Sequence, residues 1–263
     1  MVRPKKSLGQ NFLVDKNIIK KILSLVNINE NNIIEIGPGT GNLTNEILKK
    51  NPSNFLLIEK DRNLYKQLKE RNKNNNVFSI FNEDILNFDL EKRIKKNSIV
   101  FGNLPYNIST QILAKWIKLK NLNKICKKMI LMFQKEVANR IIAKSNTKDY
   151  GRISILSSWK YKITKIKDIK PSSFYPKPKI ESTILLFEPK DEYFEINKVS
   201  NLEYITNIFF NQRRKMIKKP IKLIFKNSLE ICKKLNLNEN NRPQNLSPNT
   251  YYEICREYEK LIN

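Results

Sequence analysis

The chain has 263 residues, of which 40% are apolar, and its 50 Lys and Arg against 25 Asp and Glu give a net charge of +25. That length and apolar content suffice for one large domain or for a domain with a smaller appendage. The charge favours a polyanionic partner, although a general drift of the composition toward lysine also explains part of it. The absence of histidine excludes Ser-His-Asp triads, Cys-His dyads and histidine-based metal sites.

Cysteine usage and hydropathy indicate a reducing, aqueous compartment. The three cysteines, Cys126, Cys232 and Cys255, are far apart and form no CxxC pair, so we predict neither a disulfide framework nor a bound metal. No apolar run approaches the ~20 residues that span a bilayer. The basic N-terminus lacks the apolar core of a signal peptide. We therefore expect a cytoplasmic protein without a membrane partner.

Strand-like and helix-like segments alternate from residue 32 onward. We predict a strand followed by a helix in 32–50 and in 54–70, strands in 77–84 and 98–106, a helix in 108–119, a strand and a helix in 127–144, and late strands in 161–169 and 181–189. This alternation predicts a parallel, doubly wound α/β sheet with helices on both faces. The two late strands have no helix between them, which indicates an antiparallel edge.

The pattern changes after about residue 190, where three stretches have helical character: 201–225, 228–237 and 247–262. Ser247 and Pro248 open the last stretch as a cap and a first-turn residue. We therefore predict two domains, a ligand-binding and catalytic α/β domain in 1–190 and a small helical domain in 191–263.

Glycine is scarce, with six residues in all, yet three of them fall in the EIGPGTG stretch that ends the first expected strand. Glycines let a backbone approach a ligand, and open α/β sheets bind ligands at the carboxyl ends of their strands. Glu59 closes the second strand, where a carboxylate can accept from both hydroxyls of a ribose. Asp84 closes the third strand, where a carboxylate can meet an adenine amino group. A tight turn with two solvated acids is the alternative, and this set fits nicotinamide and S-adenosylmethionine cofactors equally.

The stretch FGNLPYNIS, residues 101–109, separates these two cofactor classes. Asn103 places an amide at the end of the fourth strand, and Leu104, which precedes a proline, is pushed to an extended conformation that can turn its carbonyl outward. Pro105 stiffens the turn, and Tyr106 presents a flat ring. Two acceptors beside an aromatic plate suit a planar base with an exocyclic amine, whereas hydride transfer has no use for them. An Asn-Pro surface turn with a packed tyrosine is the alternative.

Seven motifs together resemble the ribosomal RNA adenine N6,N6-dimethyltransferase family. They are, in chain order, KSLGQNFL (6–13), EIGPGTGNLT (35–44), FGNLPYNIST (101–110), FQKEVANRI (133–141), YGRISIL (150–156), SSFYPKPKIES (172–182) and FNQRRK (210–215). They extend over nearly the whole chain and contain all six glycines. The resemblance implies a Rossmann-like domain that uses S-adenosyl-L-methionine, a small helical C-terminal domain, and methyl transfer to adenine N6.

The resemblance also assigns roles to single residues. It places the following residues around S-adenosylmethionine: Asn11, Leu13, Gly37, Glu59, Asp84 and Asn103. Glu59 would hold the ribose and Asp84 the adenine amine. The catalytic group would comprise Asn103, Leu104, Pro105 and Tyr106, with Asn103 and the Leu104 carbonyl gripping the target N6 while Tyr106 stacks on the base. Phe174 is a candidate for the other face of the base, with a hydrophobic loop anchor as the alternative.

The FNQRRK motif contains the one adjacent arginine pair of the sequence. We expect this motif on a helix that continues into further lysines. RNA phosphates would be bound there by Arg213, Arg214 and Lys215. A solvated helix face is the alternative. Pro220 departs from the family pattern and puts the geometry of that helix in question.

The main functional hypothesis is N6,N6-dimethylation of two adjacent adenines near the 3′ end of small-subunit rRNA. The expected partners are this RNA and a pre-ribosomal particle, and we expect a monomer. The alternatives are a large-subunit rRNA adenine methyltransferase of the antibiotic-resistance type and a non-catalytic ribosome-assembly factor, with a nicotinamide oxidoreductase more distant. The FNQRRK and YGR stretches favour the small-subunit type, and the intact NLPY and EIGPGTG stretches favour an active enzyme.

Overall fold

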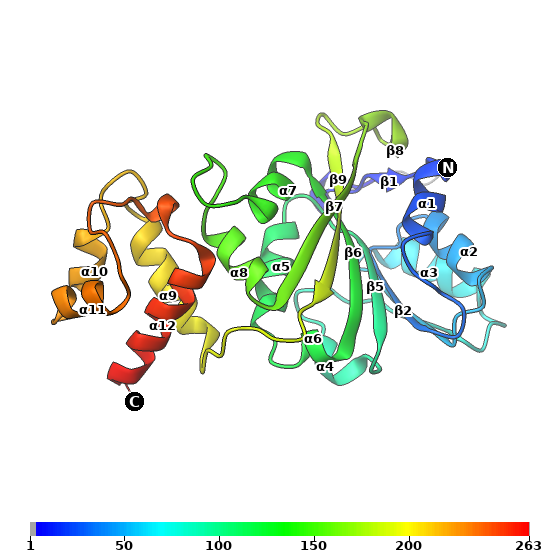
Figure 1. Ribbon diagram of the computed structural model, residues 1–263. Helices are drawn as coiled ribbons and strands as arrows, with labels where there is room; N and C mark the ends of the chain where they lie inside the picture. Colours follow the sequence, from blue (N-terminus) through cyan, green and yellow to red (C-terminus); the bar gives the residue numbers. More distant parts are fainter. Residues whose placement is uncertain (1–3, 263) are drawn as a thin grey trace. The chain divides into compact units, whose positions relative to one another are not determined.

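The computed structural model describes residues 4–262, which form two compact units. Unit 1 comprises Met1–Ala138 and Lys162–Pro189, and unit 2 comprises Asn139–Tyr161 and Lys190–Asn263. Figure 1 labels their helices and strands.

A seven-stranded sheet with the order β4-β3-β2-β5-β6-β9-β7 forms the centre of unit 1. Its strands are β2 (Asn32–Ile36), β3 (Asn54–Ile58), β4 (Phe78–Phe81), β5 (Ser98–Asn103), β6 (Cys126–Gln134), β7 (Tyr161–Ile169) and β9 (Ser182–Pro189). The pairings from β4 across to β6 are parallel, and β9 is antiparallel to β6 with β7 at the edge. The predicted doubly wound sheet and its antiparallel late strands are therefore confirmed.

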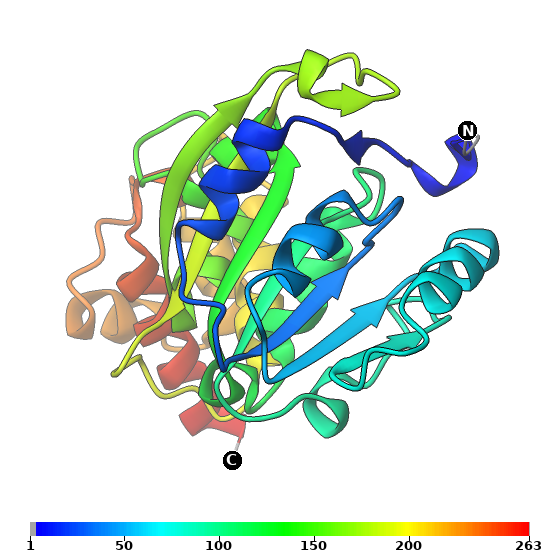
Figure 2. The same ribbon diagram turned by 90° about the vertical axis from the view of Figure 1, so that its right-hand side faces the viewer.

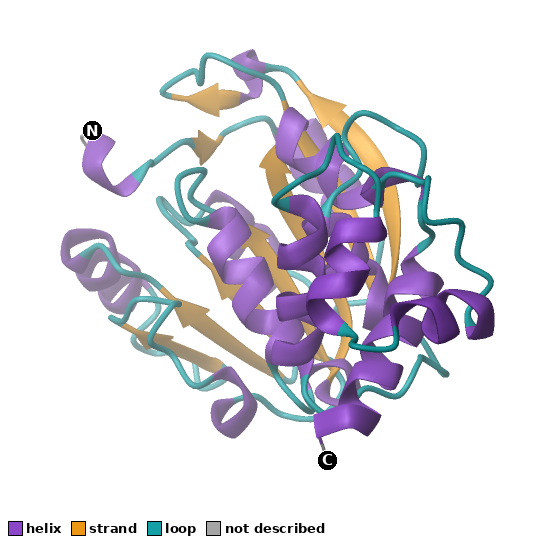
Figure 3. Cartoon of the chain, turned by 90° about the vertical axis from the view of Figure 1, so that its left-hand side faces the viewer, coloured by secondary structure: helices purple, strands orange, loops and turns teal. Residues whose placement is uncertain are grey.

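Helices cover both faces of this sheet (Figure 3). The helical segments of unit 1 are, in chain order, η1 (Lys6–Leu8), α1 (Lys16–Leu23), α2 (Asn42–Leu48), α3 (Arg62–Arg71), α4 (Leu90–Arg93), α5 (Ser109–Lys118), α6 (Leu122–Ile125), the start of α7 (Lys135–Ile142) and η2 (Pro171–Ser173). Strands β2 and β5 are each buried at all positions but one, because both of their faces are covered. The apolar faces of α1 and the sheet share one buried core, in which Ile18, Ile22, Ile33 and Phe55 take part.

A short second ladder joins the N-terminal segment to the chain before β9. Strand β1 (Phe12–Leu13) pairs antiparallel with β8 (Phe174–Tyr175), with Leu13 opposite Phe174. Figure 2 shows β1 and β8 beyond the arrowheads of the parallel strands. The N-terminal segment is thereby held at the edge of the sheet where these strands end.

Unit 2 is helical. It contains α8 (Arg152–Lys160), α9 (Val199–Phe210), α10 (Lys218–Ile224), α11 (Ser228–Lys234), η3 (Pro243–Asn245) and α12 (Pro248–Ile262). The Tyr252 hydroxyl on α12 donates to the Ile155 carbonyl on α8 at 2.8 Å, and the Trp159 indole donates to the Phe194 carbonyl at 2.7 Å. These bonds group Asn139–Tyr161 with the C-terminal helices, whereas the division expected at residue 190 placed that stretch with the sheet.

The helical stretch expected in 201–225 is broken in the middle. Helix α9 ends at Phe210, a turn follows, and α10 begins at Lys218. Pro220 is the third residue of α10, within the first turn, where its missing N–H costs no helical hydrogen bond. Ser247 accepts from the Thr250 amide at 3.1 Å and caps α12, as its sequence indicated.

No helix among residues 4–262 is both long and apolar enough to cross a membrane.

A buried carboxyl group joins β2 to α2. Glu35 is almost fully buried, and Thr44 on α2 donates to it at 2.7 Å. Burial raises the pKa of Glu35 to about 8, against the opposing effect of the Thr44 hydrogen bond. Since the pKa in the unfolded chain is near 4.5, the folded protein binds the extra proton between these two values. Its stability should therefore fall as the pH rises from about 4.5 to about 8.

We predict that Glu35→Gln removes this part of the pH dependence. The variant should match the wild type near pH 5 and exceed its Tm by at least about 3 °C at pH 8, because glutamine accepts from Thr44 without carrying a charge. Scanning calorimetry of both proteins at the two pH values measures the difference. An equal Tm difference at both pH values would show that Glu35 keeps an ordinary pKa.

Candidate active site

The carboxyl ends of three parallel strands of the sheet line one pocket of unit 1. Glu59 follows β3, Asp84 follows β4 and Asn103 ends β5. The pocket holds about 920 Å³ of space, counted with its open mouth, and residues 7–12 of the N-terminal segment form another wall. The structure thus brings together the three polar groups that the sequence placed at successive strand ends.

Glu59 receives two backbone hydrogen bonds. The Gly39 amide donates to its Oε2 at 3.1 Å, and the Asp61 amide donates to its Oε1 at 2.8 Å. Only 6% of the residue is exposed. Burial raises its pKa, while the bonds from Asp61 and Gly39 oppose the rise. Each carboxylate oxygen keeps further acceptor capacity, so the group can receive two hydroxyl donors from a ligand in the pocket.

Asp84 follows β4, the strand next to β3, and its carboxylate already has two partners. Lys60 pairs with its Oδ2 at 2.7 Å, and the Leu86 amide donates to its Oδ1 at 2.9 Å. Partial burial raises the pKa of Asp84, but the bonds from Lys60 and Leu86 outweigh that effect and hold the pKa below its usual value. The carboxylate is therefore ionised at neutral pH and can accept from an amino group.

The glycine loop needs its glycines for conformation and for space. Gly37 and Gly39 have φ values of 65° and 58°, in the region that side chains disfavour. A Cβ at Gly39 would lie 2.6 Å from the ring of Phe12, so the N-terminal segment packs directly on this loop. Gly37 lines the pocket.

Asn103 is oriented by a backbone carbonyl. Its Nδ2 donates to the carbonyl of Asn11 at 2.7 Å, which leaves its Oδ1 as the free end of the amide. No described residue donates to Asn103 Oδ1 or to the Leu104 carbonyl, whereas the Pro105 carbonyl accepts from Ile108 at 3.1 Å. The pocket therefore offers two acceptors without partners at the end of β5.

Tyr106 lines the same pocket, and its hydroxyl has a partner that the sequence did not indicate. The hydroxyl lies 2.5 Å from Ser182 Oγ at the start of β9, and Ser182 is fully buried. Burial raises the pKa of Tyr106, with the Ser182 hydrogen bond acting in the opposite direction. The bond holds the outer end of the ring in place. Because Ser182 is 76 residues away in sequence, only its place in the SSFYPKPKIES motif pointed to it.

Two of the predicted residues do not line this pocket. Leu13 lines a neighbouring, smaller pocket of about 500 Å³. Phe174, which pairs with Leu13 across the β1–β8 ladder, is 2% exposed and belongs to the hydrophobic core. In this structure the Phe174 ring therefore acts as the hydrophobic anchor that the sequence offered as an alternative, and the stacking role stays a prediction.

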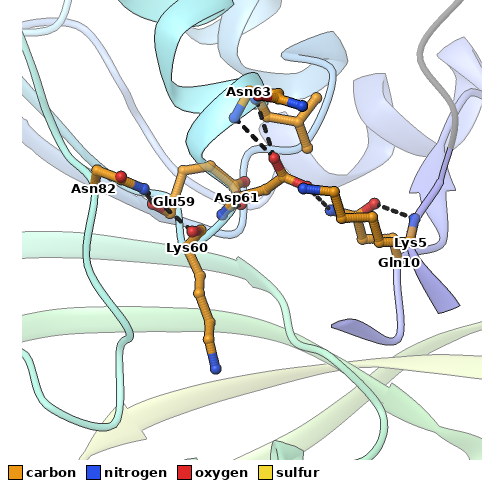
Figure 4. Close-up of polar contacts among 8 residues, drawn as sticks. Lys5, Gln10, Glu59, Lys60, Asp61, Asn63 and Asn82 are labelled. Atoms are coloured by element: carbon orange, nitrogen blue, oxygen red, sulfur yellow. Dashed lines mark hydrogen bonds and ion pairs between the residues drawn. The ribbon is translucent and has the colours of Figure 1, made fainter. Parts of the chain in front are cut away.

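A polar network ties the N-terminal segment to the turn after β3 (Figure 4). We call residues 5–13 the N-terminal strap. Gln10 Nε2 and Lys5 Nζ both donate to Asp61 Oδ2, at 3.1 Å and 2.9 Å. Asp61 Oδ1 accepts from the amides of Asn63 and Leu64 and caps α3. Sequence reasoning missed Gln10 and Asp61, although the KSLGQNFL motif contains one and an Asp at a helix start signals the other.

The basic FNQRRK motif lies in the turn after α9, not on a helix as expected, because α9 ends at Phe210. Arg213 donates to the carbonyls of Thr147 and Lys148 within unit 2 and is half-buried. Arg214 and Lys215 are exposed. Arg214 and Lys215 are therefore more open to a phosphate than Arg213, one of whose guanidinium nitrogens already donates to the two loop carbonyls.

Comparison with known proteins assigns the chain to a family. The family model described as ribosomal RNA adenine dimethylase matches residues 1–260. The chain belongs to this family. Ribosomal RNA small subunit methyltransferase A of Pelagibacter ubique (strain HTCC1062) is 51% identical over 260 residues, which cover 99% of this chain and 98% of that protein. The protein of the same name from Wolbachia sp. subsp. Drosophila simulans (strain wRi) is 40% identical over 265 residues, covering 100% and 96%.

Solved structures agree with this assignment. A dimethyladenosine transferase from Plasmodium falciparum superposes with a TM-score of 0.82 at 26% identity, covering 95% of this chain and 98% of that one. A 23S rRNA methyltransferase matches with a TM-score of 0.70 at 19% identity, which shows the fold alone. As a member of the ribosomal RNA adenine dimethylase family, the protein is an rRNA adenine dimethyltransferase with the predicted Rossmann-like fold.

The two adjacent arginines should behave differently on mutation. We predict that Arg214→Ala weakens RNA binding and reduces the salt slope by about one unit, because it removes one phosphate contact. Arg213→Ala should instead lower the Tm, because two loop carbonyls lose their donor. Filter binding over a salt series and thermal unfolding measure the two effects.

Lys124→Ala is the matched control, because it removes one exposed positive charge at the amino end of β6, the opposite edge of the sheet from the pocket. An Arg214→Ala salt slope equal to that of Lys124→Ala would assign Arg214 to a solvated surface.

Proposed function

We propose that the protein transfers methyl groups from S-adenosylmethionine to N6 of two adjacent adenines near the 3′ end of small-subunit rRNA. One observation carries the proposal. A single pocket combines Glu59, which can accept two hydroxyls, with the partnerless acceptors Asn103 Oδ1 and the Leu104 carbonyl. The first group suits a ribose, the second suits an exocyclic amine, and a methyl donor and an adenine supply these two groups.

The residues present fit the methyl donor. S-adenosylmethionine supplies an electrophilic methyl group on a sulfonium sulfur. Glu59 would hold its ribose and Asp84 its adenine amine, and Gly37 and Asn11 line the space between the strand ends. Leu13 would support the pocket from the β1 ladder and the neighbouring cavity. Lys60, which pairs with Asp84, would share that carboxylate with the ligand.

Asn103 and Leu104 would hold the target amine. Adenine N6 is a poor nucleophile because its lone pair is delocalised into the ring. Hydrogen bonds from its two N–H groups to Asn103 Oδ1 and the Leu104 carbonyl favour a pyramidal nitrogen whose lone pair faces the methyl carbon. Placement is then the main catalytic contribution. The nitrogen that forms the new C–N bond loses its proton readily to solvent, so the chain needs no histidine base.

Tyr106 would stack on the target adenine. Its half-buried ring is fixed by the bond to Ser182 and lies next to the two acceptors in sequence and in the pocket. A base must leave its helix to reach such a pocket. Phe174 would contact the other face only after leaving the core, so we assign the stacking to Tyr106 first.

The small-subunit target rests on the relatives, two of which carry the name ribosomal RNA small subunit methyltransferase A over nearly their full length. The exposed Arg214 and Lys215 on unit 2 and the net charge of +25 suit a polyanionic substrate. We propose that a monomer acts on a pre-ribosomal particle in the cytoplasm. The following experiment distinguishes this proposal from two alternatives, a large-subunit rRNA methyltransferase and a non-catalytic assembly factor.

The test is to incubate the protein with tritiated S-adenosylmethionine and small-subunit particles that lack the modification, and then to map the methylated adenines. We expect label on the N6 of two adjacent adenines near the 3′ end of the small-subunit RNA. Label on large-subunit RNA alone, or binding of particles without methyl transfer, would contradict the proposal.

Asn103 should serve the chemical step more than RNA binding. We predict that Asn103→Ala lowers the single-turnover rate at saturating cofactor and RNA by about two to three orders of magnitude, the scale of losing one preorganised polar group. RNA affinity should change little, because basic side chains elsewhere supply it. Asn121→Ala is the matched control, since this exposed asparagine caps α6 without a side-chain bond.

Two substitutions of Tyr106 separate the effect of ring stacking on the rate from the effect of the hydroxyl bond to Ser182. Tyr106→Ala should slow methyl transfer by the loss of base stacking, worth about 1–3 kcal/mol. Tyr106→Phe should have a smaller effect, which reflects only the lost anchor to Ser182. Near-normal rates in both Asn103→Ala and Tyr106→Ala would show that the NLPY stretch is only a turn.

A further inference from the structure

The N-terminal strap touches the loops at three strand ends. Phe12 packs against Gly39 of the glycine loop, Gln10 donates to Asp61 after β3, and the Asn11 carbonyl accepts from Asn103 at the end of β5. Its far end is held by the β1–β8 ladder, where the Val14 amide also donates to the Ser173 carbonyl at 2.9 Å. The strap is therefore a shared wall between the donor side and the target side of the pocket.

We propose that Asp61 is a positioning residue for methyl transfer: it fastens the strap so that the Asn11 carbonyl keeps Asn103 Oδ1 turned toward the target amine. The inference rests on the proposed function of Asn103. It assigns Asp61 and Gln10 a role in the rate of the chemical step, although neither touches the reacting atoms.

The orientation of the Asn103 amide is the first step of the argument. The two ends of an amide have similar shapes but opposite hydrogen-bonding character. Only the NH₂ end can face the Asn11 carbonyl, and the observed distance of 2.7 Å is that of a strong bond. If the carbonyl withdrew, the amide could turn over and direct NH₂ at the N–H groups of the target. Two donors would then meet, and the amine would lose its acceptor.

The position of the Asn11 carbonyl is the second step. Among the described contacts, the polar ones from residues 5–11 to the rest of the chain run only to Asp61 and to Asn103. Inside the strap, the Lys5 amide donates to Gln10 Oε1 at 2.7 Å, which turns Gln10 Nε2 toward Asp61. Figure 4 shows the Lys5 and Gln10 side chains converging on Asp61. Asp61 is thus the polar fastening on the N-terminal side of Asn11, whereas the β1–β8 ladder and the bond from Asn42 to the Leu13 carbonyl hold its C-terminal side.

The chemistry of Asp61 allows its two roles to be separated. Oδ1 caps α3 through Asn63 and Leu64, and Oδ2 receives the strap. Asparagine caps a helix about as well as aspartate. In Asp61→Asn the oxygen can keep the cap while an NH₂ group faces the donors of Gln10 and Lys5. The substitution should release the strap and leave the helix intact.

Exchanging the carboxylate and the amide between positions 61 and 10 should restore the contact between the strap and the turn after β3. In the double variant Asp61→Asn/Gln10→Glu, the amide at position 61 donates to a carboxylate at position 10, which still accepts from the Lys5 amide and pairs with its side chain. The single variant Gln10→Glu sets two carboxylates against each other and should release the strap without altering the cap. Asp89→Asn is the control, because Asp89 caps α4 and pairs with Lys92 at 3.2 Å far from the strap.

The experiment compares these four variants with the wild type in two measurements. One is single-turnover methyl transfer at saturating cofactor and RNA, and the other is deuterium uptake of the peptide that covers residues 5–13. We expect Asp61→Asn and Gln10→Glu each to slow transfer by about ten- to a hundredfold, the scale of a misplaced catalytic group, and to speed uptake in the strap. The double variant should return both values toward the wild type, and Asp89→Asn should change neither.

Three results would overturn the inference: a released strap with a normal rate, a slow rate with a protected strap, or a double variant as slow as the single ones. The wild-type rate in the same assay tests the proposed function separately. A wild type that transfers no methyl group would count against the function, whereas an active wild type with unaffected single variants would count against the role of Asp61 alone.

Discussion

The pocket depends on the hydrogen bonds that the Glu59 carboxylate accepts. Its two oxygens accept from the amides of Gly39 and Asp61, so one buried side chain joins the loop after β2 to the turn after β3. Both loops are carboxyl ends of parallel strands, which the sheet places side by side. Asp61 in turn holds the strap, and the strap holds Asn103. The proposed donor side and the proposed target side of the pocket are therefore joined by one chain of hydrogen bonds.

This arrangement explains why a chain without histidine can be a methyltransferase. The groups at the strand ends are acceptors with fixed directions: the carboxylates of Glu59 and Asp84, the amide oxygen of Asn103 and the carbonyl of Leu104. Methyl transfer to an amine requires a held nucleophile and a held electrophile more than a strong base. The burial of Glu59 would strengthen its hydrogen bonds to the proposed ligand, because they would form away from water.

Local sequence signals were enough to predict the sheet and to place three of the residues that line the pocket. The alternation of apolar runs indicated the parallel strands, and the position of Glu59, Asp84 and Asn103 at strand ends followed from it. The contact of the strap with Asp61 and the bond of Tyr106 to Ser182 could not be predicted in this way, because Gln10 and Asp61 are 51 residues apart and Tyr106 and Ser182 are 76 apart. Likewise the FNQRRK stretch has helical composition, yet α9 ends at Phe210, and Arg213 donates to carbonyls of the loop before α8, which no local pattern indicates.

A crystal structure of the protein with S-adenosylhomocysteine tests the central claim, that the ends of β3, β4 and β5 form one pocket for donor and target, most directly. The account predicts both ribose hydroxyls on the Glu59 carboxylate, the adenine amine at Asp84, and the sulfur facing the side of the pocket where Asn103 Oδ1 is free. A ligand bound in the neighbouring cavity beside Leu13, or one whose ribose does not touch Glu59, would contradict it.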